Sequence, residues 1–142
     1  QSYPALRTLL IRHEAFHGVF YEEPDFRDGI RDMWNALSED ERSYWRRLLA
    51  YMTYEPTDEY LMINEFQAYL LQQPLEAARG YLRNQLAVRL MRARPAERNE
   101  IESFLSRYPH TFERSAQDAA GLLRRHSALD AGEVRLLLPD GD

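Results

Sequence analysis

The spacing of hydrophobic and polar residues along this chain predicts helices and no confident strand. The clearest case is residues 6–21, where leucine and phenylalanine recur at helical intervals among polar positions. The predicted helices cover residues 4–21, 25 to beyond Trp34, 38–52, 57–71, 74–94, 95–108 and 111–126. We therefore expect an all-α fold, a helical array of about six to seven helices.

Local signals at the helix ends support these boundaries. Ser38 and Glu41 form a capping box, in which each side chain accepts from a free backbone N–H of the other residue. Thr57 is expected to cap the helix over residues 57–71, because a threonine oxygen can accept from the first helical turn. Proline is tolerated in a first turn, so Pro74 and Pro95 are expected to begin the helices that follow them.

The composition fits one compact domain. With 142 residues, of which 44% are hydrophobic and 12% aromatic, the chain can bury a single core. We assign Trp34, Trp45 and Tyr60 to that core. No apolar run approaches the roughly 18 residues that are needed to cross a bilayer, so no membrane span is expected.

The charge balance argues against nucleic acid as a partner. The formal net charge is −5, whereas most affinity for nucleic acid comes from basic groups that neutralise phosphates. Every basic residue is an arginine, which we interpret as genomic compositional bias. The arginines between residues 79 and 94 either contact an anionic partner or form a solvated helix face, and the solvated face is favoured. Cysteine is absent, which excludes disulfides and thiolate zinc sites.

One motif carries most of the chemistry. The segment His13-Glu14-Ala15-Phe16-His17 is an HExxH pentad within the first predicted helix. Histidines four residues apart share a helix face, so both can bind one Zn²⁺ while Glu14 flanks the water in its open position. The surrounding hydrophobic residues, including Leu6 and Leu10, predict that this helix faces the interior. The alternatives are two core histidines satisfied by hydrogen bonds and, for Glu14, a surface carboxylate.

A third candidate ligand lies in the segment 60–71, which is apolar almost all round and is therefore expected to be buried on most sides. Glu65 stands at its centre. An ionised carboxylate buried there costs several kcal/mol unless a cation or strong donors compensate it. Glu65 is therefore metal-bound, paired with an arginine or protonated, and zinc is the most economical partner.

These residues resemble the gluzincin metallopeptidases, whose pattern is HExxH followed by a glutamate on a later helix. The resemblance implies that His13, His17 and Glu65 are the zinc ligands and that Glu14 is the general base. The segment 64–69 is also similar to the Asn-Glu-x-x-Ala stretch that carries the glutamate ligand in the family's aminopeptidase branch.

Two features differ from the gluzincin pattern. Several branches place an aspartate four residues after the glutamate ligand, where this chain has Tyr69. The Tyr69 hydroxyl lies one turn beyond Glu65 and either donates to the oxyanion of the reaction or makes a structural hydrogen bond. Gluzincins also place a β-sheet before the HExxH helix, whereas the residues before His13 read as helix.

The other two histidines carry a weaker signal. His110 and His126 are alternative donors or ligands, although capping or surface positions suit them better. A di-iron carboxylate site is excluded, because it needs a second Glu-x-x-His unit and Arg107 and Leu123 occupy the required positions.

The sequence thus predicts zinc-dependent hydrolysis of a peptide or protein substrate. The alternative is a non-catalytic helical interaction domain that retains a structural or vestigial metal site. One domain is expected over residues 1–142, with the metal site within 10–72, further helices over 74–126 and a tail over 127–142. Residues 134–138 of the tail are expected to form a short strand or an extended arm. Compartment and oligomeric state are left open by these patterns.

Overall fold

The computed structural model describes residues 3–133 and confirms the all-α prediction. The described residues form seven helices and no β-strand, if α5, η1 and α6 are taken as one continuous helix. The elements are α1 (Tyr3–Glu22), α2 (Pro24–Ala36), α3 (Glu39–Tyr51), α4 (Glu59–Leu71), α5 (Leu75–Gly80), the π-helical η1 (Tyr81–Leu86), α6 (Ala87–Ala93), the 3₁₀ turn η2 (Pro95–Glu97), α7 (Arg98–Arg107) and α8 (Thr111–His126). The strand or arm predicted for residues 134–138 lies outside the described residues.

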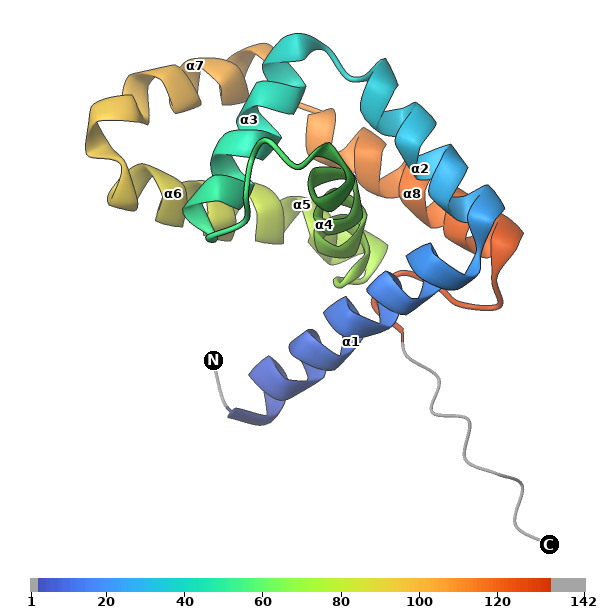
Figure 1. The fold of residues 1–142 in the computed structure, drawn as a ribbon. Coiled ribbons are helices and arrows are strands. Elements are labelled where there is room, and N and C mark those ends of the chain that lie inside the picture. The colour runs from blue at the N-terminus through green and yellow to red at the C-terminus, as the bar shows by residue number, and fades with distance from the viewer. Residues whose placement is uncertain (1–2, 134–142) are drawn as a thin grey trace, which may run out of the picture.

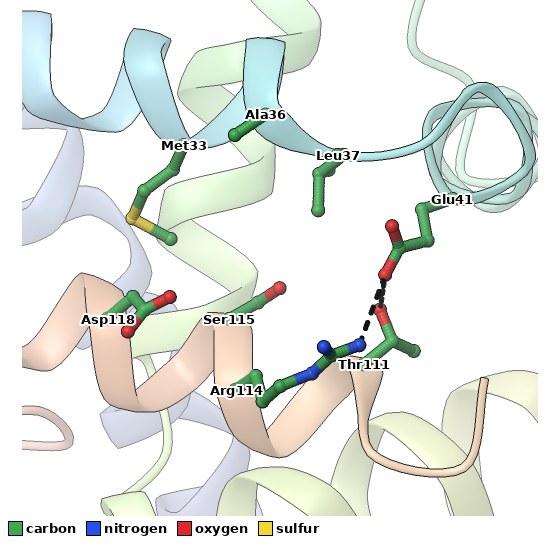
Figure 2. Close-up of a pocket in the computed structure, with 8 residues that line it drawn as sticks. All are labelled: Met33, Ala36, Leu37, Glu41, Thr111, Arg114, Ser115 and Asp118. Atoms are coloured by element: carbon green, nitrogen blue, oxygen red, sulfur yellow. Dashed lines mark hydrogen bonds and ion pairs between the residues drawn. The ribbon is translucent and has the colours of Figure 1, made fainter.

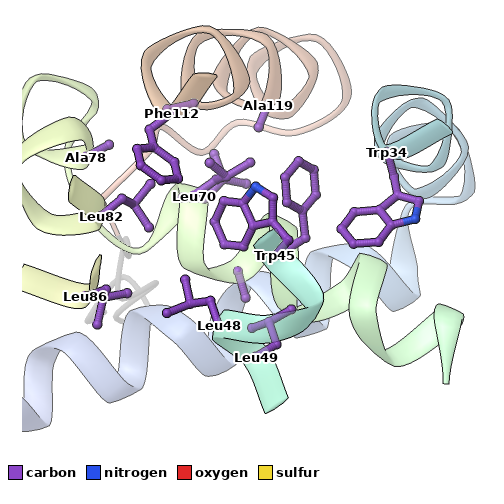
Figure 3. Packing of buried hydrophobic residues seen from close by; sticks show 14 of the residues in the cluster. Trp34, Trp45, Leu48, Leu49, Leu70, Ala78, Leu82, Leu86, Phe112 and Ala119 are labelled. Atoms are coloured by element: carbon purple, nitrogen blue, oxygen red, sulfur yellow. The ribbon is translucent and has the colours of Figure 1, made fainter. Parts of the chain in front are cut away.

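Helix α4 occupies the middle of the fold (Figure 1). It packs against α1, α2, α3 and α8, and most of its residues are buried. Trp34 and Trp45 are both buried, as predicted, and lie with Leu48, Leu70 and Phe112 in the core around α4 (Figure 3). Because α4 is surrounded on most sides, its few polar side chains have protein groups as their neighbours.

The prediction that Tyr60 belongs to the core is wrong. Tyr60 lies in the first turn of α4, and its side chain is 43% exposed. Its ring contacts the rings of Phe20 and Tyr21 on α1. An aromatic residue in the first turn of a buried helix is still near the surface, because the helix enters the core only after that turn. The pattern of apolar letters could not show this, since Tyr60 continues the apolar run of α4.

The helix starts are mostly as predicted. The capping box of α3 is present: Glu41 N–H donates to Ser38 Oγ at 3.2 Å, and Ser38 N–H donates to Glu41 Oε2 at 2.9 Å. Thr57 does not cap α4. Asp58 does, by accepting from Leu61 N–H at 3.0 Å, while the Thr57 hydroxyl donates to Glu55 at 2.8 Å. The helix therefore begins one residue later than the threonine suggests.

Helix α1 is buried only along its second half. His13, Phe16 and Phe20 are buried, but Leu6 is 45% exposed and Leu10 is 56% exposed. The expectation that the whole helix faces the interior is wrong, because the N-terminal half of α1 extends past the body of the fold (Figure 1). Within residues 3–133, no helix has both the length and the hydropathy required to cross a membrane.

Candidate metal centre

Helices α1 and α4 bring three of the predicted site residues together. The helices run in opposite directions, since His13 contacts Gln72 just beyond α4 and His17 contacts Asn64 nearer its start. Glu65 lies between the two imidazoles. Its Oε2 is 3.0 Å from His13 Nε2, and its Oε1 is 3.3 Å from His17 Nε2. Among the described residues, these histidines and no arginine pair with the Glu65 carboxylate.

The distance from each histidine to Glu65 is close to the spacing of ligands around a tetrahedral metal ion. Zinc binds histidine nitrogen and carboxylate oxygen at about 2.0 to 2.2 Å, so adjacent ligand atoms around it are about 3.3 to 3.6 Å apart. The two nitrogen-to-oxygen distances are 3.0 Å, from His13 to Oε2 of Glu65, and 3.3 Å, from His17 to Oε1 of Glu65. Each histidine nitrogen is therefore within a few tenths of an ångström of this spacing from one of the two carboxylate oxygens.

An amide network fixes the orientation of the His17 ring. The Gln67 side chain is fully buried, and its Nε2 donates to the Phe16 carbonyl at 3.1 Å and to Asn64 Oδ1 at 3.2 Å. A carbonyl oxygen can only accept, so Gln67 must present its nitrogen there and Asn64 must present its oxygen. That oxygen is 2.8 Å from His17 Nδ1, which therefore carries a proton and donates it.

The side chain of Gln72 contacts the other imidazole. Its buried Oε1 is 2.9 Å from His13 Nδ1, and with the amide in this orientation the oxygen accepts from that nitrogen. In a neutral histidine whose Nδ1 is protonated, Nε2 is an acceptor. Two such nitrogens and the Glu65 carboxylate are three acceptors that face one another. This arrangement needs positive charge between them, supplied either by protons on the imidazoles or by a metal ion.

The electrostatics of the cluster agree with this geometry. Burial opposes ionisation of Glu65, but the hydrogen bonds and charges of His13 and His17 outweigh it and lower the Glu65 pKa to about 2. Burial also lowers the pKa of His17, but hydrogen bonds to Glu65 and Asn64, with the charges of Glu65 and Glu14, more than reverse this and raise it. The pocket thus holds an ionised carboxylate and favours a cation beside it.

Glu14 lies next to the ligand cluster but is exposed. Candidate ligand atoms of His13, Glu14 and His17 all lie within 4.8 Å of one another, so this group can itself hold a metal ion. Glu65 makes closer approaches to both histidines and is buried with them. Glu65 is thus the buried carboxylate of the cluster, and Glu14 lies beside it, facing solvent.

The cluster opens into a concavity of about 370 Å³. The residues that line it are His13, Glu14, His17, Tyr21, Tyr54, Leu61, Asn64 and Glu65. Tyr69 is not among them: its ring packs edge-on against His13, with centroids 4.7 Å apart. Burial, followed by hydrogen bonds with Tyr69 and Glu65, raises the pKa of Tyr54, which keeps this phenol protonated as a donor.

Sequence reasoning missed four residues of this site. The amides of Asn64, Gln67 and Gln72 are buried polar groups in or beside an apolar helix, and that contrast was the available signal. The position of Tyr54 had no such signal, because it lies in the loop before α4 and reaches the site through the tertiary fold. His110, considered as another ligand, is exposed and pairs with Glu113 at 3.2 Å.

A second buried glutamate shows how a structural carboxylate is satisfied in this fold. Glu41 lines a pocket of about 230 Å³ between α2 and α8 (Figure 2). Its oxygens accept from Thr111 Oγ1 at 2.7 Å and from the Ser38 backbone N–H at 2.9 Å, and the Arg114 guanidinium lies 3.9 Å from Oε1. Ordinary donors therefore account for Glu41, whereas Glu65 faces two nitrogens that must first gain a proton or a metal.

Comparison of the chain with protein-family models, with curated proteins and with solved structures gives no match. The interpretation of the site therefore depends on its own geometry.

Proposed function

We propose that this protein is a zinc-dependent peptidase that resembles the gluzincins. The observation that carries the proposal is the convergence of His13 Nε2, His17 Nε2 and the Glu65 carboxylate, at 3.0 and 3.3 Å, with both opposite ring nitrogens donating to amides. A divalent cation satisfies all three acceptors at once. Protonating both imidazoles instead places two positive rings side by side, with centroids only 4.7 Å apart.

The chain's own residues have distinct roles in this proposal. His13, His17 and Glu65 hold the metal, and the chemistry that zinc supplies when bound is polarisation of a carbonyl and a lower pKa for water. Glu14 is the general base: its exposed carboxylate accepts a proton from the attacking water and transfers it to the leaving amine. Asn64 and Gln72 hold the two imidazoles in the required tautomer.

Metal analysis and activity of matched variants test this function. After incubation with zinc and dialysis, wild type should retain about one zinc per chain, His13→Ala should retain little, and the surface control His110→Ala should match wild type. Glu14→Gln should keep the metal and the fold but lose peptidase activity by about 10² to 10⁴-fold.

Two results contradict the proposal. The first is less than about a tenth of an equivalent of zinc in wild type with no effect of His13→Ala. The second is peptide hydrolysis that stays within about threefold of wild type in Glu14→Gln.

One observation favours the alternative, a non-catalytic interaction domain. The N-terminal half of α1 exposes the apolar side chains of Tyr3, Leu6, Leu10 and Ile11, each at least 45% exposed. Exposed apolar strips of this kind are typical of contact surfaces. If zinc is bound and its removal lowers the unfolding free energy, yet Glu14→Gln changes no hydrolytic rate, the metal is structural. That result supports the non-catalytic interaction domain.

A further inference from the structure

The pocket that contains the metal cluster has two chemically different halves. His13, His17 and Glu65 form the polar half, whereas Tyr21 and Leu61 belong to an apolar wall. The wall continues outside the pocket, because the rings of Tyr21 and Tyr60 lie 6.4 Å apart and are tilted toward each other. A metal site needs no such wall to bind an ion, so the wall requires a separate explanation.

The aromatic rings of the wall are exposed although their neighbours are packed. Tyr21 is 58% exposed and Tyr60 is 43% exposed, while Phe20, which contacts both rings, is buried. Phe20 meets both rings edge-on, with centroids 6.4 Å from Tyr21 and 5.5 Å from Tyr60. Exposed tyrosine rings present apolar area at little cost in conformational entropy, which is typical of surfaces that contact a ligand.

The charges around the wall limit what it can accept. The carboxylates of Glu14 and Glu65 line the same pocket, and no arginine does among the described residues. An acidic side chain placed beside Tyr21 and Leu61 would meet these two carboxylates, whereas the pocket at Tyr60 contains one charge of each sign, Arg31 and Glu59. The favoured occupant is therefore an uncharged, apolar side chain.

The position of the wall matches the reach of an extended peptide. Tyr21 follows His17 by one turn of α1, about 6 Å along the helix axis, and helical side chains lean back toward the N-terminus. An extended peptide advances about 3.3 Å per residue. A peptide carbonyl at the histidines thus places a side chain one or two residues away against Tyr21.

We propose that Tyr21, Tyr60 and Leu61 form a substrate subsite that takes an aromatic or large aliphatic side chain of a peptide, one or two residues from the bond at the metal cluster. This inference rests on the proposed peptidase function, because it names the kind of peptide that the same pocket accepts.

Peptide binding tests the subsite without turnover. The protein is Glu14→Gln with one equivalent of zinc, and the probes are N-acetylated, C-amidated Gly/Ser hexapeptides with phenylalanine, leucine, serine or glutamate placed at each position in turn. Chemical-shift titration should show that the best phenylalanine or leucine peptide binds about tenfold or more tightly than its serine counterpart. Glutamate at that position should bind no better than serine.

Matched substitutions identify the residues responsible. Adding Tyr21→Ala and Tyr60→Ala should abolish the preference, Tyr21→Phe with Tyr60→Phe should keep it, and Tyr3→Ala, an 82% exposed tyrosine on the same helix, should leave it unchanged. If the double alanine variant fails to fold, the single Tyr21→Ala should still reduce the preference severalfold.

Equal binding of all peptides, absence of peptide binding, or a preference that survives the alanine changes overturns the subsite. Hydrolysis that depends on Glu14 but shows no preference for apolar residues leaves the peptidase function standing and removes the subsite. If apolar peptides bind preferentially but wild type hydrolyses none of them, the apolar binding site stands and the peptidase function is contradicted.

Discussion

At the scale of single residues, the informative feature of this protein is the direction in which its hydrogen-bond donors point. Both imidazoles donate from Nδ1 to an amide oxygen, so both turn an acceptor nitrogen toward Glu65. An aspartate in the same place would add negative charge near the cluster, whereas these amides are neutral. The site therefore keeps one buried carboxylate, and its positive partner interacts mainly with that group.

Replacing Gln72 should weaken metal binding without unfolding the protein. Gln72→Leu removes the acceptor of His13 Nδ1, and loss of such an outer partner typically lowers metal affinity about 10 to 100-fold. Gln73→Leu, at the neighbouring half-buried position, is the control and should bind zinc as wild type does. Competition with a chromophoric chelator measures both affinities, and equal affinities would show that Gln72 has no part in orienting the ligand.

After removal of metal with a chelator, the Glu65 carboxylate should make stability depend on acid pH. Its pKa falls from 4.5 in the unfolded chain to about 2 in the fold. The stabilisation is therefore fully present above pH 4.5 and is lost as the pH falls toward 2.

Urea unfolding between pH 5 and pH 2.5 can measure this dependence, with Glu65→Gln as the comparison. The difference in unfolding free energy between wild type and variant should shrink as the pH falls. A difference that is constant over this range would mean that Glu65 is not held ionised by the two histidines.

At the scale of elements, α4 supplies Glu65, Asn64 and Gln67 from a helix that is otherwise core, and α1 crosses it with a half-buried face. Only the C-terminal half of α1 is anchored, through Phe16 and Phe20. The positions of the site residues therefore depend on this one helix contact.

Two substitutions in α1 should show that its two halves contribute differently to the free energy of unfolding. Phe16→Ala leaves a cavity at a fully buried position and should cost about 3 to 5 kcal/mol of unfolding free energy. Leu10→Ala should change it by less than about 0.5 kcal/mol, because Leu10 is exposed. Chemical denaturation measures both, and a large loss in Leu10→Ala would show that the first half of α1 is covered by another surface in solution.

At the scale of the whole molecule, the helical class and most helix boundaries could be predicted from the sequence, because periodicity and caps act locally. The pentad could also be found, since two histidines four residues apart share a face in any helix. The exposure of Leu10 and Tyr60 could not be predicted, because it depends on where α1 and α4 enter the core. The contacts of Asn64 and Gln72 with the histidines could not be predicted either, because they form only when the two helices pack.

The segment after α8 returns to the end of α4, where Gly132 N–H donates to the Leu71 carbonyl at 2.7 Å. Gly132 has a φ of +75°, and a Cβ there would lie 2.3 Å from the Pro74 nitrogen. Gly132→Ala should therefore lower the unfolding free energy by more than about 1 kcal/mol. Gly80→Ala, in a helix with open space around the Cβ, should raise it by about 0.5 to 1 kcal/mol. Thermal unfolding of both variants checks this, and shifts of the same sign would contradict it.

The placement of the proposed ligands on α1 and α4 has a topological consequence. The part of the chain between His17 and Glu65 contains the whole of α2 and α3, so an ion that joins the two residues closes a long loop. The chain has no cysteine and so cannot form a disulfide. A metal ion that links α1 to α4 would lower the conformational entropy of the unfolded chain as a disulfide does, but a chelator or acid would remove the link. The first helix is then held only by its packing and by its hydrogen bonds to Asn64, Gln67 and Gln72, and its amide hydrogens should exchange with solvent faster than in the metal-bound protein.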